Sequence, residues 1–392
     1  MSKKETEELF SVDEEFETAS IQTANIIVAG ITGTGKSTLI NAVFGDDIAA
    51  TGTGKPVTEH IAEYSNPDIP IKVWDTVGLE LDSAKTKASI NSIKKTIADK
   101  ATKMEQLDVI HAIWYCINSG GSRYQGTELK FIKELYSIGV PFIIVLTQCI
   151  DTPEDINVLE EEIKRENKEQ GMKNIKIIQV LAKDYKTRLG IIEAFGLQEL
   201  VNVTLDAMPE FLKNGFAAAQ KVDKSLKRAR SEKIIYFVAS KAKSGFWDKV
   251  PLINYVPANG KMIKMLRNIG KMYNLVISQD DLEELLENTS IDWNNAFNGL
   301  IKPFEKKYSE KVFALLQSKK EEGFKANIDF GKRDRVAKVI VFYGYVFLEA
   351  MERLWDDYTE KEVKELQSSE VVGGIKQRMN EMFQEKNKKG EK

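Results

Sequence analysis

The residues best suited to chemistry form a glycine-rich loop near the N-terminus. The run GITGTGKS, residues 30–37, satisfies the pattern G-x-x-x-x-G-K-[ST] and follows an apolar stretch, Ile26 to Ala29. Glycines let backbone N–H groups curl around a phosphate, Lys36 can reach the β- and γ-phosphates, and the Ser37 hydroxyl can bind Mg²⁺. The pattern therefore predicts a nucleotide phosphate site. Its expected nucleotide contacts are Gly30, Thr32, Gly33, Thr34, Gly35, Lys36, Ser37 and Thr38.

A second polar group is expected at the same edge of the fold. The run DTVG, Asp75 to Gly78, follows the apolar stretch Ile71 to Trp74. A carboxylate at the tip of a strand can hold Mg²⁺ through water, and a glycine three residues later can offer its N–H to a γ-phosphate. Asp75 is therefore a predicted metal contact, and Gly78 a predicted sensor of the terminal phosphate.

The elements that must position these groups alternate between strands and helices from residue 21 to about 200. Alternation of this kind predicts an α/β fold with a mostly parallel sheet and helices on both faces. Strands are expected at about 25–29, 60–65, 71–74, 109–117, 142–146 and 175–181. Helices are expected at about 36–44, 83–104, 127–138, 154–169 and 187–202.

The pattern changes in the second half of the chain, where apolar residues recur at helical spacing, as in 261–273. We expect an acidic leader over 1–20, an α/β domain over 21–205, an all-α helical domain over 206–385 and a solvated tail over 386–392. The longest apolar run, Val339 to Leu348, is too short to span a membrane and predicts a buried helix. The acidic N-terminus is the reverse of a signal peptide, and the two cysteines, Cys116 and Cys149, lie in apolar runs. These features favour the cytoplasm, either free or at a membrane surface.

The order of the motifs resembles that of Ras-like GTPases of the translation-factor class. More closely, residues 21–200 resemble Era-like bacterial GTPases and immunity-related GTPases. The resemblance implies a Ras-like G domain that binds GTP or GDP with Mg²⁺. It also implies that 52–58 form the first switch, in which Thr58 closes on Mg²⁺, with Thr51 and Thr53 as alternatives. The implied metal contacts are then Ser37, Thr58 and Asp75.

The resemblance also assigns the residues that read the base. Family members carry N-K-x-D or T-K-x-D after the fifth strand, and this chain has TQCID. Asp151 would accept hydrogen bonds from guanine N1 and N2, while Gln148 stands for the usual Asn and Cys149 for the Lys. In the last box, the Ala182 N–H would meet guanine O6 and Lys183 would lie along the ring. We expect guanine selectivity with reduced affinity.

The residue that positions the hydrolytic water is harder to assign. Many family members place glutamine after D-x-x-G, whereas this chain has Leu79, which predicts slow turnover of GTP. Thr58 and Gly78 are the implied catalytic contacts. Glu80, Arg123 and His60 are further candidates. A structural role is an open alternative for His60, in a strand, and for Arg123, capping a loop.

A basic stretch in the second half suggests an anionic partner. Residues 221–271 contain thirteen Lys or Arg and three Asp or Glu. This stretch, extended to 273, either docks on an anionic membrane or RNA, or packs a helical bundle. The pattern of residues 246–275 makes about 240–280 similar to the helical C-terminal region of immunity-related GTPases and to a helical domain found fused to Era-like GTPases in bacteria. The hypotheses are a slow GTP-dependent switch acting on an unknown protein effector, a self-assembling membrane-associated dynamin-type GTPase that forms a nucleotide-dependent homodimer, and an Era-like ribosome-assembly factor.

Overall fold

The chain contains two compact units, which divide after Lys224. The computed structural model describes residues 21–45, 48, 55–58, 61–66, 69–76, 91, 110–120, 126–188, 190–240, 260–288, 335–357, 370 and 372–377. We call residues 21–224 the sheet unit and the residues from Ser225 onward the helical unit.

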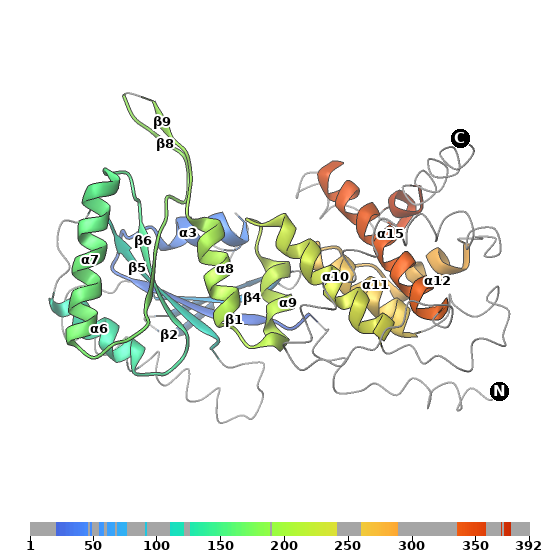
Figure 1. The fold of residues 1–392 in the computed structure, drawn as a ribbon, viewed down its shortest axis with the longest axis horizontal. Coiled ribbons are helices and arrows are strands. Elements are labelled where there is room, and N and C mark those ends of the chain that lie inside the picture. Colours follow the sequence, from blue (N-terminus) through green and yellow to red (C-terminus); the bar gives the residue numbers. More distant parts are fainter. Residues whose placement is uncertain are drawn as a thin grey trace. The chain divides into compact units, whose positions relative to one another are not determined.

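The sheet unit is built on seven hydrogen-bonded strands in the order β2-β3-β4-β1-β5-β6-β7 (Figure 1). Their bounds are β1 Ala24–Gly30, β2 Lys55–Thr58, β3 Ile61–Asn66, β4 Ile69–Thr76, β5 Ala112–Asn118, β6 Phe142–Thr147 and β7 Lys176–Gln179. The five strands β4, β1, β5, β6 and β7 are parallel, and β2 and β3 are antiparallel. The mostly parallel sheet predicted from the sequence is confirmed.

Helices cover both faces of the sheet, as expected from strands that are apolar on both sides. The bounds are α3 Lys36–Phe44, α6 Gly126–Tyr136, α7 Pro153–Glu169, α8 Leu197–Ala207 and α9 Glu210–Ala219. Ile27 and Ala29 of β1 share one apolar cluster with residues of α6 and α7. Side chains alternate along a strand, so Ile26 and Val28 face the opposite side, where α3 and α9 contact β1.

The predicted helix over 187–202 is wrong in its first half. A hairpin of β8, Tyr185–Lys186, and β9, Ile191–Ile192, overlaps the start of this segment and extends away from the sheet (Figure 1). Helix α8 begins only at Leu197. Gly196, in the left-handed conformation with φ 81°, starts that helix, and a Cβ there would lie 1.9 Å from the Gln179 carbonyl oxygen. The predicted helix over 83–104 lies outside the described residues apart from position 91.

The sheet unit extends beyond the boundary at 205 that the sequence suggested. Helix α8 contacts α3 and β7, and α9 contacts β4 and β1. The Trp114 Nε1–H on β5 also donates to the Thr204 Oγ1 on α8 at 3.0 Å. These contacts cover the sheet with helices that follow residue 196, and the compact unit therefore ends at Lys224.

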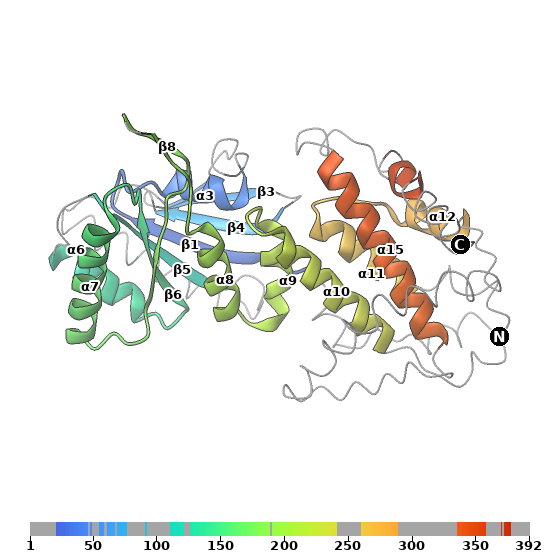
Figure 2. The ribbon, with the colours of Figure 1, turned by 45° about the horizontal axis from the view of Figure 1, so that its top comes forward.

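The helical unit contains α10 Lys224–Ser240, α11 Gly260–Met272, α12 Gln279–Asn288 and α15 Arg335–Asp357 (Figure 2). Helix α11 contacts α12 and α15. The apolar run predicted to form a buried helix lies within α15. No helix within the described ranges has the length and hydropathy needed to cross a bilayer.

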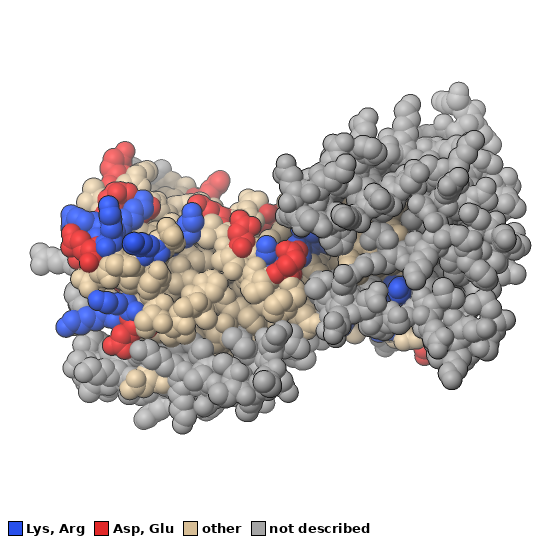
Figure 3. Space-filling view, turned by 60° about the horizontal axis from the view of Figure 1, so that its bottom comes forward, with Lys and Arg blue, Asp and Glu red and all other residues tan. Residues whose placement is uncertain are grey.

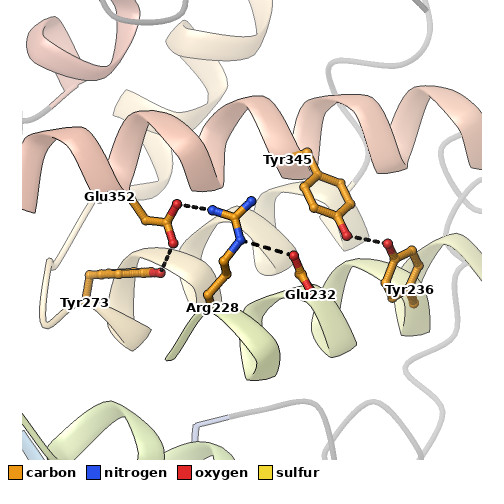
Figure 4. Close-up of polar contacts among 6 residues, drawn as sticks. All are labelled: Arg228, Glu232, Tyr236, Tyr273, Tyr345 and Glu352. Carbon is orange, nitrogen blue, oxygen red and sulfur yellow. Dashed lines mark hydrogen bonds and ion pairs between the residues drawn. The ribbon is translucent and has the colours of Figure 1, made fainter. Parts of the chain in front are cut away.

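A polar network lies among α10, α11 and α15 (Figure 4). Arg228 pairs with Glu232 and with Glu352, and the Tyr273 hydroxyl donates to Glu352. The hydroxyls of Tyr236 and Tyr345 are hydrogen-bonded to each other, and burial raises the pKa of both.

Two cations of the predicted basic stretch are buried in this unit. Lys227 is 1% exposed and donates to the Met272 carbonyl oxygen at 2.9 Å, and Arg230 is 5% exposed. Together with Arg228, three cations of α10 therefore contribute to the interior of the helical unit, which agrees with the helical-bundle alternative for this part of the stretch. Residues 241–259 of the stretch lie outside the described residues.

Candidate phosphate-binding site

The loop between β1 and α3 has the backbone that a phosphate cradle requires. Gly33 and Gly35 adopt left-handed conformations, with φ 85° and 80°. Gly30 has φ 146°, and a Cβ there would lie 2.4 Å from the Cys116 carbonyl oxygen on β5. Only glycine fits this close approach, because any side chain would collide with the neighbouring strand.

The start of α3 leaves backbone donors for an anion. Gly35 caps the helix and contributes no side-chain hydrogen bond. The first N–H groups of a helix have no intrahelical acceptor, and the helix dipole places positive potential there. Ser37 and Thr38, in this first turn, are exposed, as is Thr32 in the loop. The cradle can therefore accept an anion with backbone and hydroxyl donors.

The side chain of Lys36 turns back over the loop. Lys36 is 8% exposed, and its Nζ donates to the carbonyl oxygens of Gly30 at 3.0 Å and Ile31 at 3.2 Å. The loop carbonyls thus hold the ammonium at the cradle. The structure brings Lys36 to the place that the sequence predicted for phosphate binding.

Two residues at the end of β6 support the cradle from the neighbouring strand. The Thr147 hydroxyl, in a residue that is 4% exposed, donates to the Thr34 carbonyl oxygen at 2.6 Å. The Gln148 Nε2 donates to the Gly33 carbonyl oxygen at 3.0 Å. These hydrogen bonds fix two consecutive carbonyls of the loop. Thr147 is not among the predicted site residues, although a hydroxyl residue ending an otherwise apolar strand is a signal that could identify it.

Asp75 lies near the cradle and is buried. It is 6% exposed, pairs with Val28 of β1 in the parallel register, and its Oδ1 has no hydrogen-bond partner among the described residues. Burial raises the pKa of Asp75 from 3.8 to about 6, against the opposing effect of the Lys36 ammonium. A buried carboxylate oxygen without a donor is a good ligand for a hard cation.

The segments expected to read the base lie beside the same edge of the sheet. The Val180 N–H donates to Leu146 at 2.7 Å and the Cys149 N–H donates to Val180 at 3.3 Å, so the two base-reading loops are joined. Lys183 and Asp151 are exposed, and Ala182 is half-buried. Cys149 is 2% exposed, as its apolar run predicts, and burial raises the pKa of its thiol. Its side chain is therefore not in the exposed place of the base-packing lysine that it replaces in the predicted alignment.

The contacts also shift the motif by one residue. The predicted alignment has Gln148 in its first position, but Thr147 is the residue that ends the strand and bonds to the cradle. Gln148 then takes the second position, which the lysine of T-K-x-D occupies.

The remaining predicted residues are described only in part. Thr58 ends β2 and pairs with Ile61 of β3, and its side chain is not described. The other predicted switch and catalytic positions, Thr51, Thr53, His60, Gly78, Leu79, Glu80 and Arg123, lie outside the described residues.

Residues 25–148 match the family model described as 50S ribosome-binding GTPase. No curated protein matches the chain significantly. Among solved structures, a bacterial selenocysteine-specific elongation factor EF-Sec is 20% identical with a TM-score of 0.32, over 47% of this chain and 28% of the factor. A probable GTP-binding protein engB has the same identity and TM-score, over 47% of this chain and 98% of that protein. The elongation factor SelB of Methanococcus maripaludis, in complex with the GTP analogue GppNHp, is 17% identical with a TM-score of 0.31, over 48% of this chain and 35% of that protein.

The matched segment contains the cradle, Asp75 and the end of β6. Residues 25–148 of the sheet unit thus match a P-loop GTPase family model, and GTP hydrolysis is the activity expected from that match.

Proposed function

We propose that this chain is a Mg²⁺-dependent GTPase with slow intrinsic turnover that acts as a nucleotide-dependent switch on a protein effector. The observation that carries the proposal is the pairing of a phosphate cradle over residues 30–37 with a buried carboxylate, Asp75, whose Oδ1 has no hydrogen-bond partner among the described residues. An anion cradle next to an unsatisfied carboxylate is suited to a metal-bound polyphosphate.

The residues present fit Mg²⁺. Asp75 offers a buried carboxylate oxygen, and the exposed Ser37 hydroxyl stands in the first turn of α3. Oxygen ligands of this kind are the ones Mg²⁺ prefers, usually with several waters retained. Thr58, at the end of β2, would be the third contact. When bound, Mg²⁺ would neutralise charge on the phosphate oxygens.

The protein's own groups would hold the phosphates. Lys36 would exchange its hydrogen bonds to the carbonyls of Gly30 and Ile31 for bonds to phosphate oxygens. The first N–H groups of α3 would donate to the same anion, with the helix dipole adding to the attraction. Thr147 and Gln148 would keep the loop in shape during the exchange.

Isothermal titration with GDP, in the presence of Mg²⁺ and in EDTA, tests the proposal. We expect binding that weakens when Mg²⁺ is removed, and no binding by a Lys36→Ala variant. Lys164→Ala is the matched control, because Lys164 is an exposed lysine of α7 whose ion pairs stay within that helix. Equal GDP binding by the two variants would refute the proposed role of the cradle.

Ribosome binding is a second candidate function, and the family description supports it. Among the residues coloured in Figure 3, Lys and Arg side chains lie beside Asp and Glu side chains rather than forming a patch of one sign. Sedimentation with 50S subunits would test the candidate, comparing a non-hydrolysable GTP analogue with GDP. Association that depends on the GTP analogue and is lost in Lys36→Ala would support it, and absence from the pellet in both states would exclude it.

A further inference from the structure

We propose that this chain does not read guanine N1 and N2 with a carboxylate, which leaves the Ala182 N–H, the group that the resemblance places at guanine O6, to separate guanine from adenine. The proposal rests on the proposed function, because it concerns the base of a nucleotide whose phosphates lie at residues 30–37. It assigns Ile150, rather than Asp151, to the position that faces the N1–N2 edge of the base.

The side chain of Gln148 lies against the phosphate cradle. Its Nε2 bonds to the Gly33 carbonyl oxygen at 3.0 Å and would lie 3.4 Å from a Cβ placed on Gly35. The exposed Gln148 side chain therefore runs along the flank of the cradle. On this flank we place the base of a bound nucleotide. A side chain in this place can pack on the base, as the stem of a lysine would.

The side chain of Cys149 is buried. Its Sγ lies 3.3 Å from the Leu146 carbonyl oxygen, and the residue is 2% exposed, so this side chain points into the core. Gln148 has φ 55°, and the Ile150 N–H bonds to the Gln148 carbonyl oxygen at 2.8 Å. This three-residue turn, centred on Cys149, leaves Gln148 and Ile150 on either side of it. Because Cys149 is directed into the core, Ile150 is the next residue after Gln148 that we place beside the base.

The carboxylate of Asp151 lies close to Gly120, in the turn after β5. Its Oδ2 lies 3.6 Å from the position that a Cβ on Gly120 would take, so the carboxylate faces the turn after β5. That turn is itself fastened, since the Ser119 hydroxyl donates to the Gln148 carbonyl oxygen at 2.9 Å. Asp151 is one residue beyond Ile150, and its carboxylate is directed at Gly120.

A backbone donor remains for the base. Within the described part of the chain, the Ala182 N–H donates no hydrogen bond. Its direction is fixed by the preceding residue, because Leu181 and Phe195 exchange two backbone hydrogen bonds of 3.1 and 3.0 Å. Guanine and hypoxanthine both carry the acceptor O6, whereas adenine carries an amino group that would leave this N–H unpaired.

The two arrangements predict different base profiles. A carboxylate that accepts from guanine N2 loses a charge-assisted hydrogen bond when hypoxanthine replaces guanine, which weakens binding about tenfold or more. Without that carboxylate, IDP should bind within about threefold of GDP, since the two bases differ only in the N2 amino group. ADP should bind at least about tenfold more weakly than either, because the Ala182 N–H is then buried without an acceptor.

Displacement of a fluorescent GDP from the full chain, with Mg²⁺ present, measures this profile for GDP, IDP, XDP and ADP. We expect wild type to accept GDP and IDP alike, and Asp151→Asn to leave the whole profile unchanged. Ile150→Asp should raise the preference for GDP over IDP about tenfold. Ile150→Asn is the matched control, because asparagine has nearly the shape of the aspartate in Ile150→Asp but carries no charge.

Three outcomes would count against these assignments. A tenfold preference of wild type for GDP over IDP, removed by Asp151→Asn, would show that Asp151 reads the base and would overturn the proposal. Equal displacement by ADP would overturn the role of Ala182. Failure of every nucleotide to displace the probe would instead refute the proposed function. The profiles of wild type and Asp151→Asn decide the question even if the Ile150 variants fold poorly.

Discussion

Removing the charge of Asp75 should stabilise the nucleotide-free protein at neutral pH. Burial raises the pKa of this carboxyl from 3.8 to about 6, with the Lys36 ammonium opposing the shift. The folded state therefore holds the proton more tightly than the unfolded state does. Below about pH 4 this group contributes close to nothing to the free energy of unfolding. As the pH rises its ionisation lowers that free energy, and the loss is complete above about pH 6.

The size of the effect follows from the shift in pKa. A shift of about two units corresponds to about 3 kcal/mol of destabilisation at pH 8, since each unit is about 1.4 kcal/mol. Asp75→Asn keeps the shape of the side chain and removes the charge. We expect its free energy of unfolding to exceed that of wild type by about 3 kcal/mol at pH 8 and by close to zero at pH 4.

Hydrogen exchange of the β1 and β4 amides, in EDTA and without nucleotide, is the appropriate assay because a chain of two units need not unfold in one step. Asp151→Asn is the control for the change in net charge, because Asp151 is exposed. If Asp75→Asn is no more stable than wild type at pH 8, or if its advantage is the same at pH 4, then desolvation of Asp75 does not oppose folding.

Three further predictions test the cradle and the reaction. Lys36→Ala should abolish displacement of a fluorescent GDP and leave the far-ultraviolet circular dichroism spectrum unchanged; retained GDP binding would contradict the role of Lys36. Thr147→Val removes the hydroxyl that bonds to Thr34 at 2.6 Å, so GDP affinity should fall roughly tenfold, about 1.4 kcal/mol, whereas Ser137→Ala, which removes an exposed hydroxyl at the end of α6, should leave it unchanged. The dilute protein should hydrolyse GTP at less than about one per minute, and Leu79→Gln should change that rate little. A rate that rises steeply with protein concentration would indicate a group supplied by a second copy, and fast turnover at high dilution would refute the slow switch.

The parts of the fold that the sequence predicted well have strong local signals. The apolar run before the glycine-rich loop gave β1, and the helical spacing of 36–44 matches α3. The loop itself could be assigned because its glycines and Lys36 are required by the chemistry. Its support from Thr147 depends on a contact across 113 positions of the chain, which no local pattern contains.

Two differences have identifiable physical causes. The segment 187–202 has helical composition, but the turn from Thr187 to Gly190, where the Thr187 N–H donates to the Gly190 carbonyl oxygen at 2.8 Å, forms a hairpin first. In the proposed alignment the base-reading motif begins at Thr147, one residue earlier than alignment on Asp151 predicts. This alignment rests on the burial of Cys149 and on the hydrogen bonds of Thr147 and Gln148. These are tertiary contacts, which no local sequence pattern contains.

The β8–β9 hairpin has a consequence for handling the protein in solution. Of the large apolar side chains exposed among the described residues, three belong to it or to its base: Tyr185, Ile191 and Phe195, which are 45%, 59% and 40% exposed. A short hairpin with apolar side chains and unpaired outer edges is prone to associate with other chains as concentration rises. Loss of material during concentration should therefore begin at this hairpin. Ile191→Lys, at its most exposed apolar position, is the surface change with which to improve solubility for crystallisation or spectroscopy.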